Sequence, residues 1–313
     1  MDTTENTNPL EAVDARTKLA GSNKLEILLF SLGTEEVFGI NVFKVREVTK
    51  TPPVTQTPNM PAGIQGVISL RGHIIPVISL ASFFKLTDRQ DASEGTMLVT
   101  EYSRRTQGFL VHDVDRIVRV DWDQVKSADG ILSGHQHMVT AITELPSGKL
   151  VSIVDVEQIL VDAFGEATIP KLAPVEHSQD RTVFFVDDSA VARREISAVL
   201  DQLGVKYHQA NNGKEAWERL QSMAQRATQD NQPLLSQLNV ILVDAEMPEM
   251  DGYVLTQNVK ADRRFEGIPV VMHSSLSSDA NRTMGKKVGV DAYVAKFDAS
   301  MLGETLRPLL QMH

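Results

Sequence analysis

Residues 240–252 read VILVDAEMPEMDG, and this stretch decides the fold of the C-terminal half of the chain. Residues 240–243 form a short apolar run of the kind found in buried strands, and Asp244 follows at its carboxyl end. The proline and glycine that come next favour a tight turn. A fully apolar strand that turns into a helix is typical of a parallel sheet covered on both faces.

The rest of this half repeats the same alternation of strand and helix. We predict strands at 183–186, 205–209, 240–243, 270–273 and 292–295, and helices at 190–203, 214–226, after Gly252, before residue 292 and at 301–311. Five such units predict an α/β doubly wound domain with the flavodoxin-like strand order 2-1-3-4-5. In that order the first and third strands are neighbours.

Three acidic residues lie where these two strands end. Asp187 and Asp188 follow the first strand, and Asp244 ends the third. At about 4 Å and an effective dielectric of about 20, each pair of carboxylates repels by about 4 kcal/mol. A hard cation such as Mg²⁺ among oxygen ligands would relieve that repulsion. Alternatively, the paired aspartates only cap the helix that follows them.

Three further features suit phosphoryl chemistry, although each alone is weak. Lys296 ends the fifth strand and could neutralise a phosphoryl group on Asp244, whereas a lone lysine there is usually only solvated. Ser274 ends the fourth strand and offers a hydroxyl donor, whereas serine there is more often a turn former. The tight path of residues 246–252 could aim the backbone carbonyl of Glu246 at a metal.

Taken together, these motifs resemble those of response-regulator receiver domains over residues 181–313. The matching strings are FFVDDS (184–189), VDAEMPEMDG (243–252), MHSS (272–275) and AYVAKF (292–297). The resemblance implies that Asp244 accepts the phosphoryl group and that Mg²⁺ is held by Asp187, Asp188, Asp244 and the Glu246 backbone carbonyl. It further implies that Ser274 and Lys296 hold the phosphoryl oxygens and that Tyr293 is the switch aromatic.

Two residues of this half need separate comment. Tyr293 could instead be an ordinary half-buried aromatic on a strand. Phe297 departs from the family, in which many members carry proline after the lysine, so the isomer of the Lys296–Phe297 peptide is open.

The N-terminal half has a different pattern of predicted secondary structure. Short strands are predicted at 25–32, 37–42, 67–70, 74–78, 97–101, 109–114, 138–144 and 150–154, with glycine and proline between them and a helix at 156–164. Closely spaced strands without helices predict antiparallel barrels. Residues 1–23 are a polar lead-in, and residues 166–180, with two prolines and no apolar period, are the predicted linker.

Three strings in this half resemble CheW-like coupling domains over residues 24–165. They are FSLGTEEVFGINVFKVREV (30–48), GVISLRGHIIPVISL (66–80) and GKLVSIVDVEQIL (148–160). The resemblance implies two five-stranded β-barrels that bind chemoreceptor tips and a chemotaxis histidine kinase, with Val45, Glu47 and Arg71 as interface candidates. Plain packing or surface exposure is the alternative for these three. Ser79 departs from the family, which often has aspartate before Leu80.

Composition narrows the functional classes. The formal net charge of −10 argues against a nucleic-acid binder, and the absence of cysteine excludes disulfides and zinc–thiolate sites. No apolar run approaches the roughly 20 residues that span a bilayer, and the N-terminus lacks a signal core. We therefore expect a cytoplasmic protein without membrane insertion.

A coupling domain followed by a receiver domain resembles the CheV-type chemotaxis coupling proteins. This implies a signalling adaptor at chemoreceptor arrays that couples chemoreceptors to the histidine kinase. Phosphorylation of Asp244 would regulate it, with no turnover beyond slow hydrolysis of its own phosphate.

Several alternatives compete with this interpretation. One is a phosphate-sink receiver. Another is an aspartate-nucleophile phosphatase, because Glu246 lies two positions after Asp244, where such enzymes carry an acid/base. A DNA-binding regulator is opposed by the acidic charge and the missing helix-turn-helix. A histidine kinase would need a phosphorylatable histidine helix and glycine-rich ATP boxes, which we do not find in the sequence.

Overall fold

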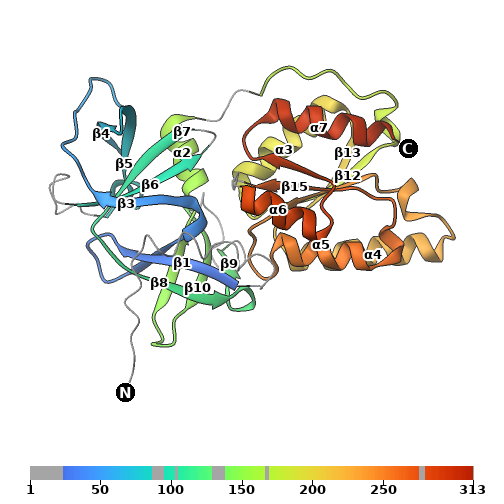
Figure 1. Cartoon of the computed structure of the whole chain (residues 1–313), viewed down its shortest axis with the longest axis horizontal. Coiled ribbons are helices and arrows are strands. Elements are labelled where there is room, and N and C mark those ends of the chain that lie inside the picture. The colour runs from blue at the N-terminus through green and yellow to red at the C-terminus, as the bar shows by residue number, and fades with distance from the viewer. Residues whose placement is uncertain are drawn as a thin grey trace.

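The computed structural model describes residues 24–86, 95–102, 105–128, 138–165, 169–274 and 279–312, so the predicted lead-in at 1–23 lies outside the described residues. The chain forms two halves that lie side by side (Figure 1). The N-terminal half is built from β-sheets and two helices, whereas the C-terminal half alternates strands and helices.

The N-terminal half contains two sheets. The first has the order β8-β1-β2-β11-β10-β9 and the second has the order β3-β6-β7-β5-β4. The strands of the first sheet are β1 (Lys24–Ser31), β2 (Val37–Asn41), β8 (Asp113–Asp121), β9 (Lys126–Ser127), β10 (Val139–Glu144) and β11 (Leu150–Val154). Those of the second are β3 (Val45–Lys50), β4 (Ile64–Leu70), β5 (His73–Ser79), β6 (Thr96–Tyr102) and β7 (Arg105–Val111). The prediction of a half built from β-sheets is confirmed, but the sheets are not purely antiparallel, because β2 and β11 pair in parallel, as do β5 and β7. The two-residue β9 gives the first sheet six strands rather than five.

Three strands, β3, β8 and the two-residue β9, were not predicted. Charged residues interrupt the sequences of β3 (VREVTK) and β8 (DVDRIVRVD), so neither contains a long apolar run. The single strand expected at 109–114 is wrong, because the chain changes sheets there. Val111 ends β7, and the His112 backbone N–H donates to the Ser31 carbonyl of the other sheet at 2.9 Å.

The core of this half lies between the sheets and helix α2 (Val156–Phe164). Large apolar side chains such as Phe30, Phe38 and Phe109 fill it, and the short helix α1 (Leu80–Phe83) packs at its edge. α2 has the bounds that the sequence predicted and buries its apolar face in this core. Glu157 and Gln158 of the same helix are also buried, which shows that a second surface covers α2.

The C-terminal half is a parallel sheet with the order β13-β12-β14-β15-β16, which confirms the predicted order 2-1-3-4-5. The strands are β12 (Thr182–Val186), β13 (Lys206–Ala210), β14 (Val240–Asp244), β15 (Val270–Ser274) and β16 (Ala292–Ala295). The helices are α3 (Ala190–Leu203), α4 (Gly213–Gln229), α5 (Gly252–Ala261), α6 (Asp279–Val288) and α7 (Ala299–Gln311). α3 and α7 pack on one face, and α4 and α5 pack on the other.

Side-chain caps fix where the helices next to the strand ends begin. Ser189 is the N-cap of α3, and its hydroxyl accepts from the Ala192 N–H at 3.3 Å. Asp251 caps α5 in the same way through the Val254 N–H at 2.7 Å. Because Ser189 performs this role, the alternative that the paired aspartates cap α3 is not needed to explain them.

The described part of the predicted linker, residues 169–180, follows the surface of the C-terminal half. Val175 is buried, and its N–H donates to the Leu203 carbonyl at 2.9 Å. The Leu172 N–H donates to Gln202, and Arg307 of α7 donates to the Ala173 and Pro174 carbonyls. The boundaries of the linker stay a prediction, but most of it is attached to the second half.

Candidate functional site

The three predicted acidic residues meet at one edge of the parallel sheet. Strands β12 and β14 are neighbours, with Val186 opposite Val243, so the residues that follow them emerge together. One carboxylate oxygen from each of Asp187, Asp188 and Asp244 lies within 4.8 Å of the others. Asp187 and Asp244 are almost completely buried. The sequence prediction of their convergence therefore agrees with the structure.

Lys296 reaches this cluster from the end of β16. Its Nζ lies 3.0 Å from Asp244 Oδ2, as the sequence predicts, and also 3.0 Å from both carboxylate oxygens of Asp187. The lysine side chain is only 2% exposed. A single buried ammonium thus bridges the carboxylates that end two different strands, a link to Asp187 that the sequence did not predict.

These charges shift one another's pKa values in opposite directions. Burial opposes the charged form of Asp187, but Lys296 and His273 outweigh it and lower its pKa to about 2. Burial, together with Asp187 and Asp188, raises the pKa of Asp244 well above its usual value despite Lys296. Burial also raises the pKa of Asp188 to about 6. The ammonium of Lys296 alone is therefore not enough to keep all three clustered carboxylates ionised.

The donor set fits a hard divalent cation. All the converging side-chain atoms are carboxylate oxygens, which Mg²⁺ prefers, and the surplus negative charge favours a cation of charge +2. Glu246 adds two buried carboxylate oxygens without a hydrogen-bond partner. Burial raises the pKa of this carboxyl to about 7.

The loop after Asp244 depends on one glycine. Gly252, the first residue of α5, donates its N–H to the Ala245 carbonyl at 3.0 Å. A Cβ atom at this position would overlap the Asp244 carbonyl oxygen. Only glycine therefore lets α5 begin so close to the backbone of the acidic residue.

Ser274 and Tyr293 lie together on the neighbouring strands. Ser274 is fully buried at the end of β15 and forms a side-chain hydrogen bond with Tyr293 of β16. Burial raises the pKa of the tyrosine to about 12, and the Arg282 guanidinium lies 5.7 Å from the centre of its ring. The Lys296–Phe297 peptide is trans, and Phe297 adopts a left-handed φ of 63°.

His273 is a site residue that the sequence analysis did not single out. It lies opposite Asp244 in the β14–β15 register, and its Nδ1 is 3.9 Å from Asp187 Oδ2. Burial lowers its pKa, so it is neutral near pH 7. The sequence feature that could have identified it is its position directly before Ser274 in the MHSS motif.

The interface candidates of the N-terminal half have mixed surroundings. Val45 is buried at the start of β3, so packing accounts for it. Glu47 of β3 and Arg71 in the β4–β5 turn form an ion pair at 2.8 Å, and the arginine side chain is 74% exposed. Ser79, the departure from the family pattern, caps α1 by accepting from the Ser82 N–H at 3.2 Å.

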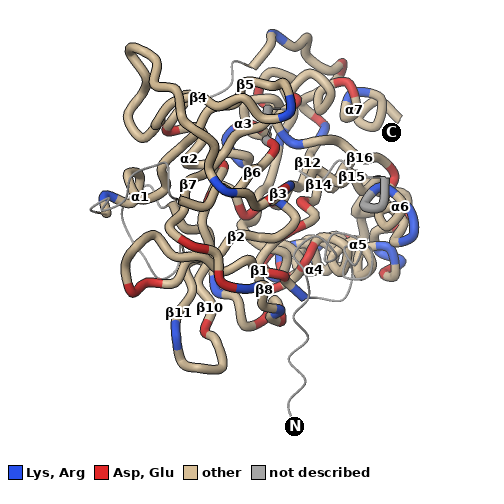
Figure 2. Tube along the Cα trace, turned by 60° about the vertical axis from the view of Figure 1, so that its left-hand side comes forward, with Lys and Arg blue, Asp and Glu red and all other residues tan. Residues whose placement is uncertain are grey.

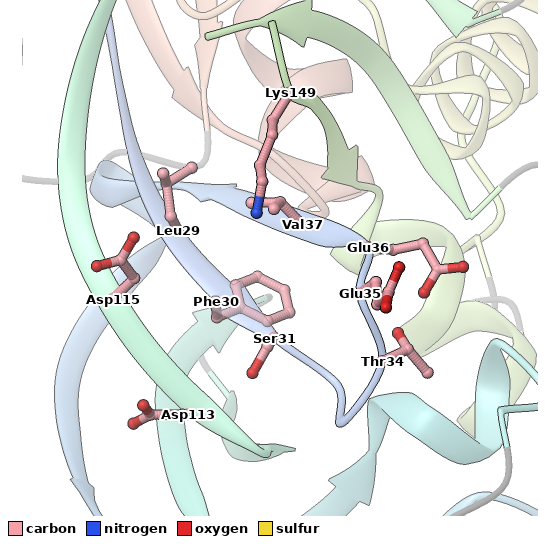
Figure 3. Close-up of a pocket in the computed structure, with 10 residues that line it drawn as sticks. All are labelled: Leu29, Phe30, Ser31, Thr34, Glu35, Glu36, Val37, Asp113, Asp115 and Lys149. Carbon is pink, nitrogen blue, oxygen red and sulfur yellow. The ribbon is translucent and has the colours of Figure 1, made fainter. Parts of the chain in front are cut away.

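A separate pocket of about 500 Å³ lies in the N-terminal half (Figure 3). Residues of β1, β2 and β8 line it, and Lys149 extends across it from the turn between β10 and β11. It contains none of the residues of the aspartate cluster. Acidic and basic residues are interspersed along both halves (Figure 2). Among the described helices, none is both long and apolar enough to cross a bilayer.

Comparison with known proteins gives the family. Residues 26–164 match the CheW-like domain, and residues 183–307 match the response regulator receiver domain. Over 281 residues the chain is 33% identical to chemotaxis protein CheV3 of Helicobacter pylori, covering 88% of this chain and 89% of that protein. It is 28% identical over 328 residues to CheV1 of the same organism, covering 97% and 98%.

A third relative resembles only the first half. The chemotaxis protein CheW of Klebsiella aerogenes is 31% identical over 151 residues, which cover 46% of this chain and 87% of that protein. The chain therefore belongs to the CheV family of chemotaxis proteins, in which a CheW-like coupling domain precedes a response-regulator receiver domain.

Proposed function

We propose that this protein is a chemotaxis adaptor whose coupling domain links chemoreceptors to the histidine kinase and whose receiver is phosphorylated on Asp244. The observation that carries the proposal is the clustering of Asp187, Asp188 and Asp244 with Lys296, at the strand ends of a domain attached to a CheW-like domain.

Asp244 is the proposed nucleophile. One of its carboxylate oxygens attacks the phosphorus of a phosphohistidine on the kinase, the P–N bond breaks, and the leaving imidazole takes up a proton. The product is an acyl phosphate on Asp244. Mg²⁺, held by Asp187, Asp188, Asp244 and the Glu246 carbonyl, would neutralise charge between the nucleophile and the phosphoryl group.

Lys296 and Ser274 are proposed to hold the new phosphoryl oxygens. Lys296 already contacts Asp244, so a small shift away from Asp187 brings its ammonium to the phosphoryl group. Ser274 would exchange its contact with Tyr293 for one with a phosphoryl oxygen. Tyr293 would then change its position, which is the local event that a two-state switch requires.

The partners follow from the family. We propose that the histidine kinase and the cytoplasmic tips of chemoreceptors bind the coupling domain, with Glu47 and Arg71 at the contact surface, and that the protein is cytoplasmic and gathers at receptor arrays. No turnover is proposed beyond slow hydrolysis of the protein's own acyl phosphate.

Phosphorylation with a small phosphoramidate and Mg²⁺ tests the chemistry. The wild type should gain one hydroxylamine-labile phosphate, and Asp244→Asn should gain none. Asp201→Asn, which changes an exposed aspartate on α3, is the matched control and should behave as the wild type. Continuous release of phosphate from many esters would instead identify a phosphatase.

A receptor-coupled kinase assay tests regulation. Wild type and Asp244→Ala should affect kinase activity equally without a phosphodonor and differently with one. Equal effects under both conditions would contradict regulation through Asp244 and favour a phosphate sink.

A further inference from the structure

The coupling domain contacts the receiver on both sides of the aspartate cluster. Helix α2 lies beside α3 (Figure 1), where Arg194 Nη2 donates to Gln158 Oε1 at 3.5 Å. On the other side, the Glu249 N–H donates to the Trp122 carbonyl at 3.1 Å. Arg194 belongs to the helix that follows Asp188, and Glu249 belongs to the loop that follows Asp244. The two contacts therefore flank the site.

Charged residues of the coupling domain are buried between these contacts. Lys44, in the short helix η2 (Val42–Lys44), places its Nζ 3.3 Å from Glu157 Oε1 on α2. Glu157 is fully buried, and its other oxygen, Oε2, has no hydrogen-bond partner. Asp155, the N-cap of α2, is buried as well. Buried charges of this kind are rare in the core of a single domain and indicate a contact between two polar surfaces.

Lys44 lies on the side of the coupling domain that is turned toward the aspartate cluster. Its ammonium is attracted by Asp188 of the receiver as well as by Glu157 and Asp155 of its own domain. The coupling domain therefore brings a buried positive charge to the acidic edge of the receiver's sheet.

The proposed acceptor is buried in this structure. In-line attack requires an open approach to a carboxylate oxygen of Asp244, and this residue is only 2% exposed in the structure. Ser274, which would hold the phosphoryl group, is 0% exposed. Lys44 also brings a positive charge to the region where a divalent cation would bind.

We propose that the coupling domain closes over the phosphorylation site through Lys44, α2 and the turn η3 (Trp122–Gln124). The closed state slows phosphorylation of Asp244, and phosphorylation in turn destabilises the closed state. This inference rests on the proposed function of Asp244. It adds the coupling domain as an inhibitory cap on the receiver, held by the contact of α2 with α3 and by the hydrogen bond from Glu249 to Trp122.

Electrostatic repulsion explains why phosphorylation and the closed state oppose each other. Phosphorylation adds a charge of about −1.5 to −2. The cap contributes the carboxylates of Asp155 and Glu157 against one ammonium, so the new charge is repelled by the surface that covers it. Coupling between two sites is reciprocal, so a state that excludes the phosphoryl group is itself disfavoured once the group is present.

The connection between the domains suits such a movement. Residues 169–180 are attached to the receiver, so only residues 166–168 separate them from Gly165 at the end of α2. A tether this short keeps the two surfaces at a high effective concentration. The two domains therefore cannot separate far, and the contact between them is restored after dephosphorylation.

A covalent lock tests the cap in the whole 313-residue chain, which contains no cysteine. The double variant Gln158→Cys, Arg194→Cys is joined across α2 and α3 with a bis-maleimide. Phosphorylation by phosphoramidate and Mg²⁺ should then be slower by about tenfold, within the range of about 5- to 150-fold typical of coupled sites. The same variant labelled with a monofunctional maleimide is the control. Equal rates for the locked and control proteins overturn the proposal.

A charge reversal tests the role of Lys44 from the opposite direction. Lys44→Glu should loosen the cap and raise the phosphorylation rate above that of Lys50→Glu, which reverses an exposed lysine of the same domain. Equal rates for these two variants would overturn the role of Lys44. If no form of the protein, wild type included, gains phosphate, the proposed function itself fails. If all forms gain it at one rate, that function stands and the cap is refuted.

Discussion

Replacing Lys296 by methionine should strongly destabilise the receiver, because it removes the buried charge that joins two carboxylates. Its Nζ lies 3.0 Å from both Asp187 and Asp244, where each attraction amounts to about 5 kcal/mol at an effective dielectric of about 20. Breaking a buried ion pair by removing one partner typically costs about 3–5 kcal/mol. We expect the lower end, about 3 kcal/mol, because Asp244 can take up a proton.

The loss should depend on pH in a defined direction. Without Lys296 the pKa values of Asp187 and Asp244 rise in the folded state. A carboxyl with a raised folded pKa supports stability at low pH, and that support is lost as pH rises through the folded pKa. The loss of unfolding free energy caused by Lys296→Met should therefore be small near pH 5 and grow toward pH 8.

Urea unfolding followed by tryptophan fluorescence measures this loss. The chain has two tryptophans, and a Trp122→Phe background leaves Trp217, which packs 6.0 Å from Phe265 in the receiver core. Lys206→Met, at an exposed lysine on β13, is the matched control and should change stability little. Mg²⁺ should stabilise the Lys296 variant more than the wild type, because it replaces the missing positive charge.

Two results would refute this reasoning. One is a loss below about 1 kcal/mol at pH 8 without Mg²⁺, which would show that the lysine does not compensate the buried carboxylates. The other is a deficit that shrinks as the pH rises from 5 to 8, which has the opposite sign to the linkage above.

Three further predictions concern single residues. Gly252→Ala should cost about 1–3 kcal/mol in urea unfolding and slow phosphorylation, because its Cβ overlaps the Asp244 carbonyl; an unchanged midpoint would contradict this. Glu195→Gln should flatten the dependence of receiver stability on pH. Burial raises the Glu195 pKa from 4.5 to about 7. Its contribution to the stability of the folded state is therefore complete below pH 4.5 and is lost as the pH rises through 7. If the stability of the variant depends on pH in the same way as that of the wild type, this prediction is wrong. Ser79→Ala should cost about 1 kcal/mol in the coupling domain by removing the cap of α1, measured as a lower unfolding midpoint of that domain in a Trp217→Phe background.

Much of the receiver was predictable because its signals are local. Apolar runs of four or five residues fixed the strands, and the aspartates that end them fixed the acidic edge of the sheet. The coupling domain was harder to predict, because charged residues interrupt β3 and β8 and leave no long apolar run to mark them. Hydrophobic periodicity also gave no sign of the change of sheet at His112, because a single bent residue separates β7 from β8 there.

By itself, the sequence determined the two domains, the order of the parallel strands and the convergence of Asp187, Asp188 and Asp244. Only the tertiary structure decided that Lys296 also pairs with Asp187, and that α2 of the coupling domain meets α3 of the receiver, where Arg194 donates to Gln158. The physical reason is that hydrophobic periodicity records which face of each element is buried. How two folded polar surfaces meet depends on shape and charge in three dimensions, which no local pattern contains.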